Sequence, residues 1–423
     1  MQNREAATEP TGPGQIMLIP VPGWSRDEIV PPDCPDPVLG TALWQGARDA
    51  GLWGCTRPRD RHGLFVPPAA PPDFDPASPF TRALQTLHLL VREPGQVTEA
   101  DVGKACADIA AIAETTGDLS LARRYAEAWA YADQSSARAA ATAGQLCTRL
   151  AEYPRGEIWL QRAVRLGRMA RDWEWYIRGY LRLGSLKFNL GVYPPARRYY
   201  VRAYRMAIWA GHLSLAGKAH HDLMTICTDL GEIQRGIEHA EAVHRFYPAN
   251  DPVFPYFVHD FAFLLAQGGY HHEAMTLLSA ALNYIPPHRQ LLIRGTLART
   301  AAALNQRPLY EELTAQVEEL ASTSQEGAAA AFIRVADGAR QLGSWERAEF
   351  YAARGLHIAH SRHEGQPQRL SHEVLDRVSM RDQTGNAPVP VKQDVSLLVA
   401  RFLTRLRRHR AAGESAGALT KLP

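Results

Sequence analysis

Apolar residues recur at intervals of three and four positions from about residue 80 to residue 360, and polar residues fill the positions between them. This spacing is typical of amphipathic α-helices, because one helical turn spans about 3.6 residues. Alanine is abundant in the same span, and the breaks between periodic segments are short. The pattern therefore predicts an all-α fold made of consecutive helices joined by short turns.

The periodic region also repeats a longer unit. Its clearest copy has Gly184 in a first helix, Gly191 and Tyr193 at a turn, and Ala196 and Ala203 in a second helix. Glycine at the turn supplies the left-handed backbone that ends the first helix, and the small residues let the two helices approach closely. Copies of the unit place this turn at positions 117, 151, 191, 231, 269, 307 and 343, with spacings of 34, 40, 40, 38, 38 and 36 residues.

The unit resembles the tetratricopeptide repeat (TPR), in which a small residue in helix A, Gly and Tyr at the turn, and two Ala in helix B recur. Residues 177–210 match this signature well, and the other units match it less closely. Most units exceed the standard length of about 34 residues, as in the long-repeat variants of bacterial regulators and scaffolds. The resemblance implies a TPR-like α-solenoid of about seven helix hairpins over residues 98–360, wound into a right-handed superhelix.

The chain before the repeats has a different composition. Residues 1–80 hold 15 of the 29 prolines, and residues 81–360 hold 10, so the first segment cannot be continuously helical. We expect residues 1–14 to be disordered and residues 15–80 to form an irregular segment that packs on the solenoid through its aromatic side chains. The remaining boundaries are a leading helix and turn at 81–97, a final short helix and linker at 361–393, an amphipathic helix at 394–410 and a frayed tail at 411–423.

The helix at 394–410 combines an apolar stripe with a basic face. Its apolar side chains recur at helical spacing, among them Leu398, Phe402 and Leu406, so the stripe must be buried against something. Three alternatives remain open at this point. The helix caps the last repeat, it docks on a partner or on a second copy of the chain to give a homo-oligomer, or it binds an anionic membrane surface.

Composition narrows the class of protein. The chain has 423 residues, of which 46% are hydrophobic and 22% charged, as expected for a folded protein of two or three domains. It contains no uncharged apolar run long enough for a transmembrane segment, and no basic region precedes an apolar one as in a secretory signal. Five scattered cysteines without CxxC spacing fit a reducing compartment, which predicts a cytoplasmic protein. The net charge of +3 is too small to indicate direct nucleic-acid binding.

Motifs that carry catalysis are missing from the sequence. It has no Walker A loop, GxGxxG, GxSxG or HExxH pattern, so we expect no enzymatic activity, no cofactor and no metal. Adjacent histidine pairs point about 100° apart on a helix and are poor chelates. Cys55, Asp60 and His62 lie close together in the first segment, which leaves an enzyme that uses this segment as a third and weaker hypothesis.

The first helix of each repeat is expected to line a concave groove, as the resemblance implies. With the turn residue numbered 15, the family contacts ligands at positions 2, 5, 9, 12 and 13. Basic residues dominate position 2, all of position 13 is polar, and two central repeats carry histidine at position 5. The groove residues predicted in this way are Arg138, Arg178, Lys218, Arg294, Asn189, Asp229, Gln267, Asn305, Gln341, His221 and His259.

A row of amides can pair with the backbone of an extended peptide, and a row of basic side chains can pair with carboxylates. The competing interpretation is a solvated face, because polar residues are also common beside turns. The leading hypothesis is a non-catalytic scaffold or adaptor that binds a protein or peptide through its concave face. The alternative is a regulatory sensor that acts on a transcription or signalling partner, which would itself make any contact with DNA.

Overall fold

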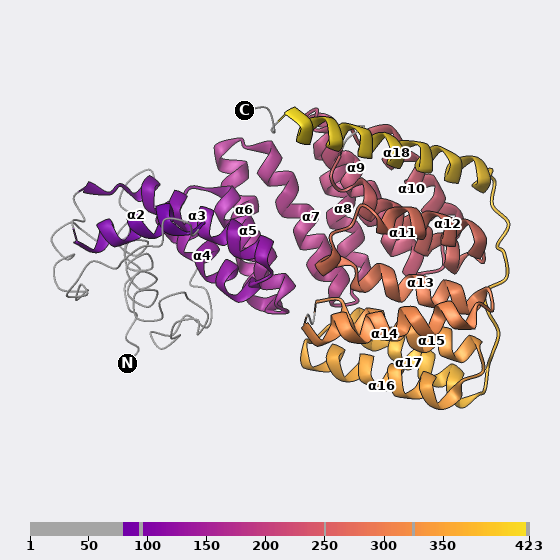
Figure 1. Ribbon diagram of the computed structural model, residues 1–423. Coiled ribbons are helices and arrows are strands. Elements are labelled where there is room, and N and C mark those ends of the chain that lie inside the picture. Colours follow the sequence, from indigo (N-terminus) through magenta and orange to yellow (C-terminus); the bar gives the residue numbers. More distant parts are fainter. Residues whose placement is uncertain (1–78, 93–95, 249–250, 324–325, 420–423) are drawn as a thin grey trace, which may run out of the picture.

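The computed structural model describes residues 79–92, 96–248, 251–323 and 326–419, and the chain in these ranges is all-α (Figure 1). The all-helical prediction is therefore confirmed for this part of the chain. The predictions for residues 1–14 and 15–80, and for the cluster of Cys55, Asp60 and His62, concern residues outside these ranges.

Seventeen α-helices and one short 3₁₀-helix follow one another in the described residues. They are α2 (Thr81–Arg92), α3 (Glu99–Thr116), α4 (Leu119–Ala132), α5 (Ala137–Arg149), α6 (Tyr153–Ala170), α7 (Trp173–Asn189), α8 (Tyr193–Trp209), α9 (Leu213–Asp229), α10 (Ile233–Phe246), α11 (Phe254–Gln267), α12 (His271–Leu282), η3 (Pro287–Arg289), α13 (Leu291–Ala303), α14 (Arg307–Thr323), α15 (Ala328–Gln341), α16 (Trp345–Ser361), α17 (Gly365–Ser379) and α18 (Val395–Leu419).

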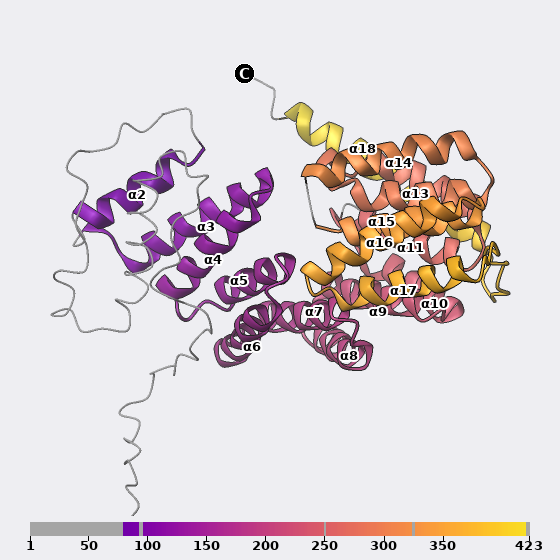
Figure 2. The same ribbon diagram turned by 90° about the horizontal axis from the view of Figure 1, so that it is seen from below.

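Consecutive helices pack on one another in chain order. Each odd-numbered helix from α3 to α15 contacts the even-numbered helix that follows it, which gives a series of helix pairs. The odd-numbered helices from α5 to α17 also contact one another in sequence, so the first helices of the pairs form one continuous row. The row curves far enough that α17 contacts α7. Figure 2 shows the helices of the row from below.

The turns within the pairs lie close to where the sequence places them. Six of them have a residue with positive φ at a predicted position, namely Gly117, Ala151, Gly191, Gly231, Gly269 and Gly343. The seventh prediction, position 307, is wrong by two residues. Asn305 adopts the left-handed conformation there, with φ of 56°, and Arg307 already begins α14. Asparagine tolerates this region better than most residues, so it replaces the glycine that the pattern requires.

Gly184 on α7 shows how closely a helix pair packs. A Cβ atom at this position would lie 2.6 Å from Cδ1 of Tyr200 on α8, well inside van der Waals contact. Both Tyr200 and Ala196, one turn earlier on α8, are buried. The small residue is therefore required by the tyrosine ring across the pair.

We expect Gly184→Ala to lower the free energy of unfolding by about 1–3 kcal/mol, because the added methyl group overpacks this contact. Urea denaturation measures the loss. The cost of the same substitution should shrink in a Tyr200→Leu background, where the smaller side chain leaves room for the methyl group. An equal cost in both backgrounds would show that the tyrosine ring is not what excludes the methyl group.

The C-terminal part of the chain returns along the stack. Residues 380–394, which we call the strap, run from the end of α17 along one edge of the stack to α18 (Figure 1). Helix α18 then packs on α11 and α12. It runs to Leu419, so residues 411–419, where the sequence predicted a frayed tail, are helical.

The apolar stripe of α18 is covered by the chain itself. Leu398, Phe402 and Leu406 are all buried, and Phe402 inserts among aromatic side chains of α11. The helix covers the central pairs, whereas the capping alternative placed it on the last repeat. Hydrophobic periodicity identifies a buried face, but it does not say which surface buries that face.

Candidate functional site

A cavity of about 350 Å³ lies inside the curve of the first-helix row. Its walls come from α5, α7, α9, α11, α13 and α15, and the start of α17 closes one side. Two predicted groove residues, Asn189 and Asp229, line it together with Arg149, which the same numbering places in their row. The structure therefore brings the position-13 residues of three successive pairs to one cavity.

Most charged groups around this cavity are paired. Arg149 forms ion pairs with Glu114 at 2.6 Å and Glu326 at 2.8 Å, which link α3 and α5 to the residues before α15. Asp229 accepts hydrogen bonds from the Tyr193 hydroxyl at 3.0 Å and from Nε2 of Gln366 at 2.9 Å. Burial raises the pKa of Asp229, although the hydrogen bonds from Gln366 and Tyr193 oppose this shift.

The two position-5 histidines meet at one carboxylate. Asp260 lies 2.8 Å from Nε2 of His221 and 2.9 Å from Nδ1 of His259. Although burial favours the protonated acid, these hydrogen bonds hold the pKa of Asp260 well below its usual range. Nε2 of His259 lies 3.0 Å from the hydroxyl of Thr296, which has 0% exposed surface. A hydroxyl without exposed surface cannot reach a substrate, so this chain of hydrogen bonds orients side chains in the wall of the cavity.

Arg334 also lines the cavity, although the sequence pattern does not predict it as a site residue. Its guanidinium lies 4.1 Å from the centre of the Phe263 ring and donates to the Leu292 carbonyl and the Thr296 hydroxyl. It forms no ion pair with any described residue, and burial lowers its pKa to about 10. It occupies position 6, next to the predicted row, and only the long-range packing of α11, α13 and α15 shows that it lines the cavity.

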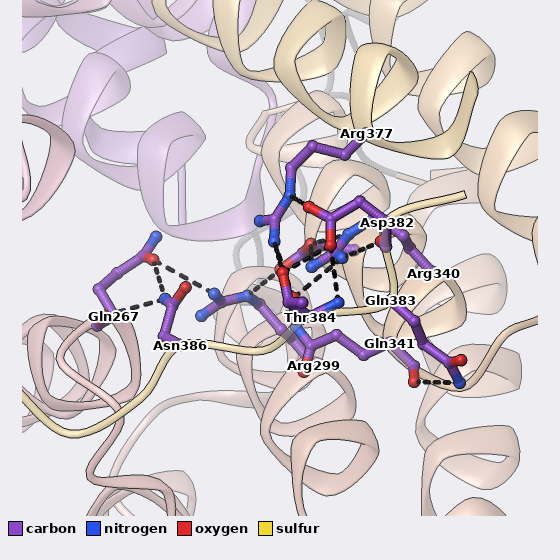
Figure 3. Close-up of polar contacts among 10 residues, drawn as sticks. Gln267, Arg299, Arg340, Gln341, Arg377, Asp382, Gln383, Thr384 and Asn386 are labelled. Carbon is purple, nitrogen blue, oxygen red and sulfur yellow. Dashed lines mark hydrogen bonds and ion pairs between the residues drawn. The ribbon is translucent and has the colours of Figure 1, made fainter. Parts of the chain in front are cut away.

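The strap is held at the turns of two helix pairs (Figure 3). The Asn386 amide donates to both the carbonyl and Oε1 of Gln267, at 2.9 and 3.0 Å. The Val389 N–H donates to the Gly268 carbonyl at 2.9 Å, and Nε2 of Gln383 donates to the Gln341 carbonyl at 3.1 Å. Two predicted position-13 amide residues, Gln267 and Gln341, therefore contact an irregular segment of the same chain.

A buried ionic cluster anchors the start of the strap. Asp337 on α15 lies 2.6 Å from Nε of Arg299 and 2.8 Å from Nη2 of Arg340. Arg340 in turn donates to the carbonyls of Asp382 and Thr384 in the strap. Burial alone would raise the pKa of Asp337, but the two guanidinium groups hold it at about 2. Figure 3 shows Arg340 beside the strap residues Asp382 and Thr384, and Arg299 beside Gln267.

We expect the chain to lose stability in acid through Asp337. Its folded-state pKa of about 2 lies below the ordinary value of 3.8, so the stabilisation is complete above about pH 4 and disappears as the pH falls toward 2. This difference between the two pKa values of Asp337 corresponds to about 2 kcal/mol in the free energy of unfolding. The free energy of unfolding, measured with urea, should fall more steeply for the wild type than for Asp337→Asn as the pH is lowered from 5 to 2.5. Parallel curves would show that another group carries the acid sensitivity.

The remaining predicted residues lie elsewhere. Lys218 pairs with Asp222 at 2.6 Å on its own helix, and Arg294 donates to Gln290 and Gln316. Asn305 is the left-handed turn residue, so with the corrected turn neither Arg294 nor Asn305 keeps its place in the predicted rows. Arg138 and Arg178 both approach the indole ring of Trp175. The other predicted groove residues thus divide among the cavity, the strap edge and the surroundings of Trp175, and Lys218, Arg294 and Asn305 belong to none of these.

No family model matches the chain, and no curated protein matches it. Within the described ranges, no helix is long and apolar enough to cross a membrane. The same part of the chain has no group of three or more His, Cys, Asp or Glu side chains arranged to hold a metal ion.

Proposed function

We propose that the chain is a non-catalytic interaction scaffold or adaptor of the TPR-like solenoid type, with about seven hairpins in a right-handed superhelix. It binds an extended segment of a partner protein or peptide on the surface formed by its first helices and their turns. Support comes from the order of the helix pairs, the positive-φ turns at spacings of 34–40 residues, and the polar lining of the cavity.

The observation that carries this proposal is the strap. A segment without helix or strand structure lies on the stack, and Gly268, Tyr270 and Arg340 form hydrogen bonds with its backbone. Such bonds recognise extended polypeptide with little dependence on its side chains. A surface that holds one such segment in cis has the donors and acceptors to hold another from a partner.

A regulatory sensor is the second candidate. The cavity supports a sensor function, because Arg334 lines it and has no carboxylate partner among the described residues. A sensor would couple occupation of this cavity to a transcription or signalling partner. Cytoplasmic location remains part of both proposals.

Site-specific photocrosslinking tests the proposed function. A crosslinking amino acid replaces Asn189, which lines the cavity, and in a matched variant it replaces Trp209, which is exposed on α8. In a lysate of the source cells, the variant at Asn189 should form a covalent adduct with a defined polypeptide, identified by mass spectrometry. Adducts formed only from position 209 would place binding on the outer helices and contradict the proposal.

A further inference from the structure

Three guanidinium groups surround the indole ring of Trp175. Arg138 on α5 lies 5.8 Å from the ring centre, and Arg178 and Arg182 on α7 lie 5.3 and 5.4 Å from it. Arg138 is also 5.6 Å from the Trp129 ring, so its position is fixed between two indoles. We call Arg138, Arg178 and Arg182 the Trp175 arginine cluster.

The described carboxylates near this cluster do not neutralise its three positive charges. Arg178 pairs with Glu174 at 2.8 Å, but Arg138 and Arg182 form no ion pair with any described residue. Glu114 attracts Arg182 electrostatically, but its carboxylate already forms an ion pair with Arg149 at 2.6 Å. Two of the three positive charges therefore lack a bound counter-charge.

Arg182 shows the cost of this arrangement most clearly. Its Nη1 atom is buried and has no hydrogen-bond partner. Burial, together with the neighbouring Arg178, lowers the pKa of Arg182 to about 9, in a residue type that is normally always charged. Cation–π contacts recover only part of the cost of burying a guanidinium. A ligand that brings negative charge and acceptor oxygens to the exposed Arg138 and the partly exposed Arg178 would offset the positive charge that Arg182 adds beneath them.

We propose that the Trp175 arginine cluster is a subsite for a phosphorylated side chain of the partner peptide. A phosphate monoester carries a charge of about −1.5 to −2 at neutral pH and three acceptor oxygens, which matches two uncompensated guanidinium groups better than one carboxylate does. The planar forks of arginine suit bidentate bonds to phosphate oxygens. This inference rests on the proposed function, because the cluster lies on α5 and α7, two of the first helices that would bind the partner.

Titration of the full chain with short peptides tests the subsite. The probes are Gly-Gly-Ser-Gly-Gly with the serine phosphorylated, the same peptide unphosphorylated, the peptide with glutamate in place of serine, and inorganic phosphate. The phosphorylated peptide should bind at least about tenfold more tightly than each of the others. Inorganic phosphate binding as tightly as the phosphopeptide would identify a free-anion site and overturn the proposal.

Variants assign the binding to the cluster. Arg182→Gln and, separately, Arg138→Gln should each weaken phosphopeptide binding about tenfold. Arg138 is exposed, so its replacement keeps the test valid if Arg182→Gln disturbs folding. Arg354→Gln is the matched control, because this guanidinium also lies over a ring, 4.2 Å from the Phe332 centre, but on α16. Equal phosphopeptide binding by all three variants and the wild type would overturn the proposal.

Failure of this subsite is distinguishable from failure of the proposed function. If the phosphopeptide shows no preference while crosslinking at position 189 still captures a polypeptide, the scaffold function stands and the phosphate subsite is wrong. If crosslinking captures nothing and the phosphopeptide binds through Arg182, the cluster is a phosphate site on a protein with another function.

Discussion

Phe402→Asp is expected to lower the free energy of unfolding by at least about 4 kcal/mol and to release α18 from the stack. The ring has 0% exposed surface and lies 4.9 Å from the Phe261 ring and 5.3 Å from the Phe257 ring. Removing a buried phenylalanine side chain costs about 3–5 kcal/mol, and placing a carboxylate in this aromatic pocket adds a desolvation penalty. Urea denaturation measures the loss, and hydrogen exchange of α18 measures its release.

Leu397→Asp is the matched control for this prediction. Leu397 lies on the same helix but is 48% exposed, so the same change should alter the unfolding free energy by less than about 1 kcal/mol. Comparable losses from both substitutions would mean that α18 tolerates no negative charge at all. Full stability of Phe402→Asp would show that the helix is not packed as described.

The second large effect concerns the anchor of the strap. Asp337→Ala should cost about 3–5 kcal/mol, because it leaves the guanidinium groups of Arg299 and Arg340 buried without a counter-charge. Arg340 also donates to two strap carbonyls, so the loss should include faster hydrogen exchange at residues 382–384. Urea denaturation and hydrogen exchange report these two consequences separately.

An exposed ion pair provides the comparison. Glu311 pairs with Arg347 at 2.6 Å, and both side chains are about 41% exposed. Glu311→Ala should therefore cost no more than about 1 kcal/mol. A small loss in Asp337→Ala as well would indicate that Arg299 and Arg340 find other partners or water, and that the cluster does not anchor the strap.

Hydrophobic periodicity was sufficient to predict the all-α fold and most of the turns, because these features depend on neighbouring residues. Gly191, Gly231 and Gly269 have the left-handed backbone that their spacing predicted. The turn predicted at position 307 lies two residues earlier, and the reason for this error is also local. Asn305 provides the same conformation as glycine, and a search based on glycine places the turn incorrectly.

The candidate site was predictable only in part, because its parts meet through contacts between distant residues. Gln267 and Gln341 were identified as polar row residues, but nothing in the local pattern indicates that the strap, more than 40 positions later, would contact them. Apart from its charge, nothing in the sequence marks Arg334 as a site residue. It lines the cavity only because three helices pack around the same space.

Two glycines provide a matched pair of variants that tests whether the strap surface recognises extended polypeptide. Both Gly231 and Gly269 have positive φ, so replacement by alanine strains the turn similarly. A Cβ atom at position 231 meets nothing within 4 Å, whereas one at position 269 would lie 2.5 Å from the Pro388 nitrogen of the strap. The two variants therefore differ mainly in whether the strap surface is blocked.

The most direct measurement is binding of a labelled peptide with the sequence of residues 381–394 to a chain in which residues 383–390 are replaced by a glycine-serine linker of equal length. We expect saturable binding, detected by fluorescence anisotropy, that Gly269→Ala abolishes and Gly231→Ala leaves intact. Absence of binding, or equal binding by the two alanine variants, would contradict the claim that this surface recognises extended polypeptide.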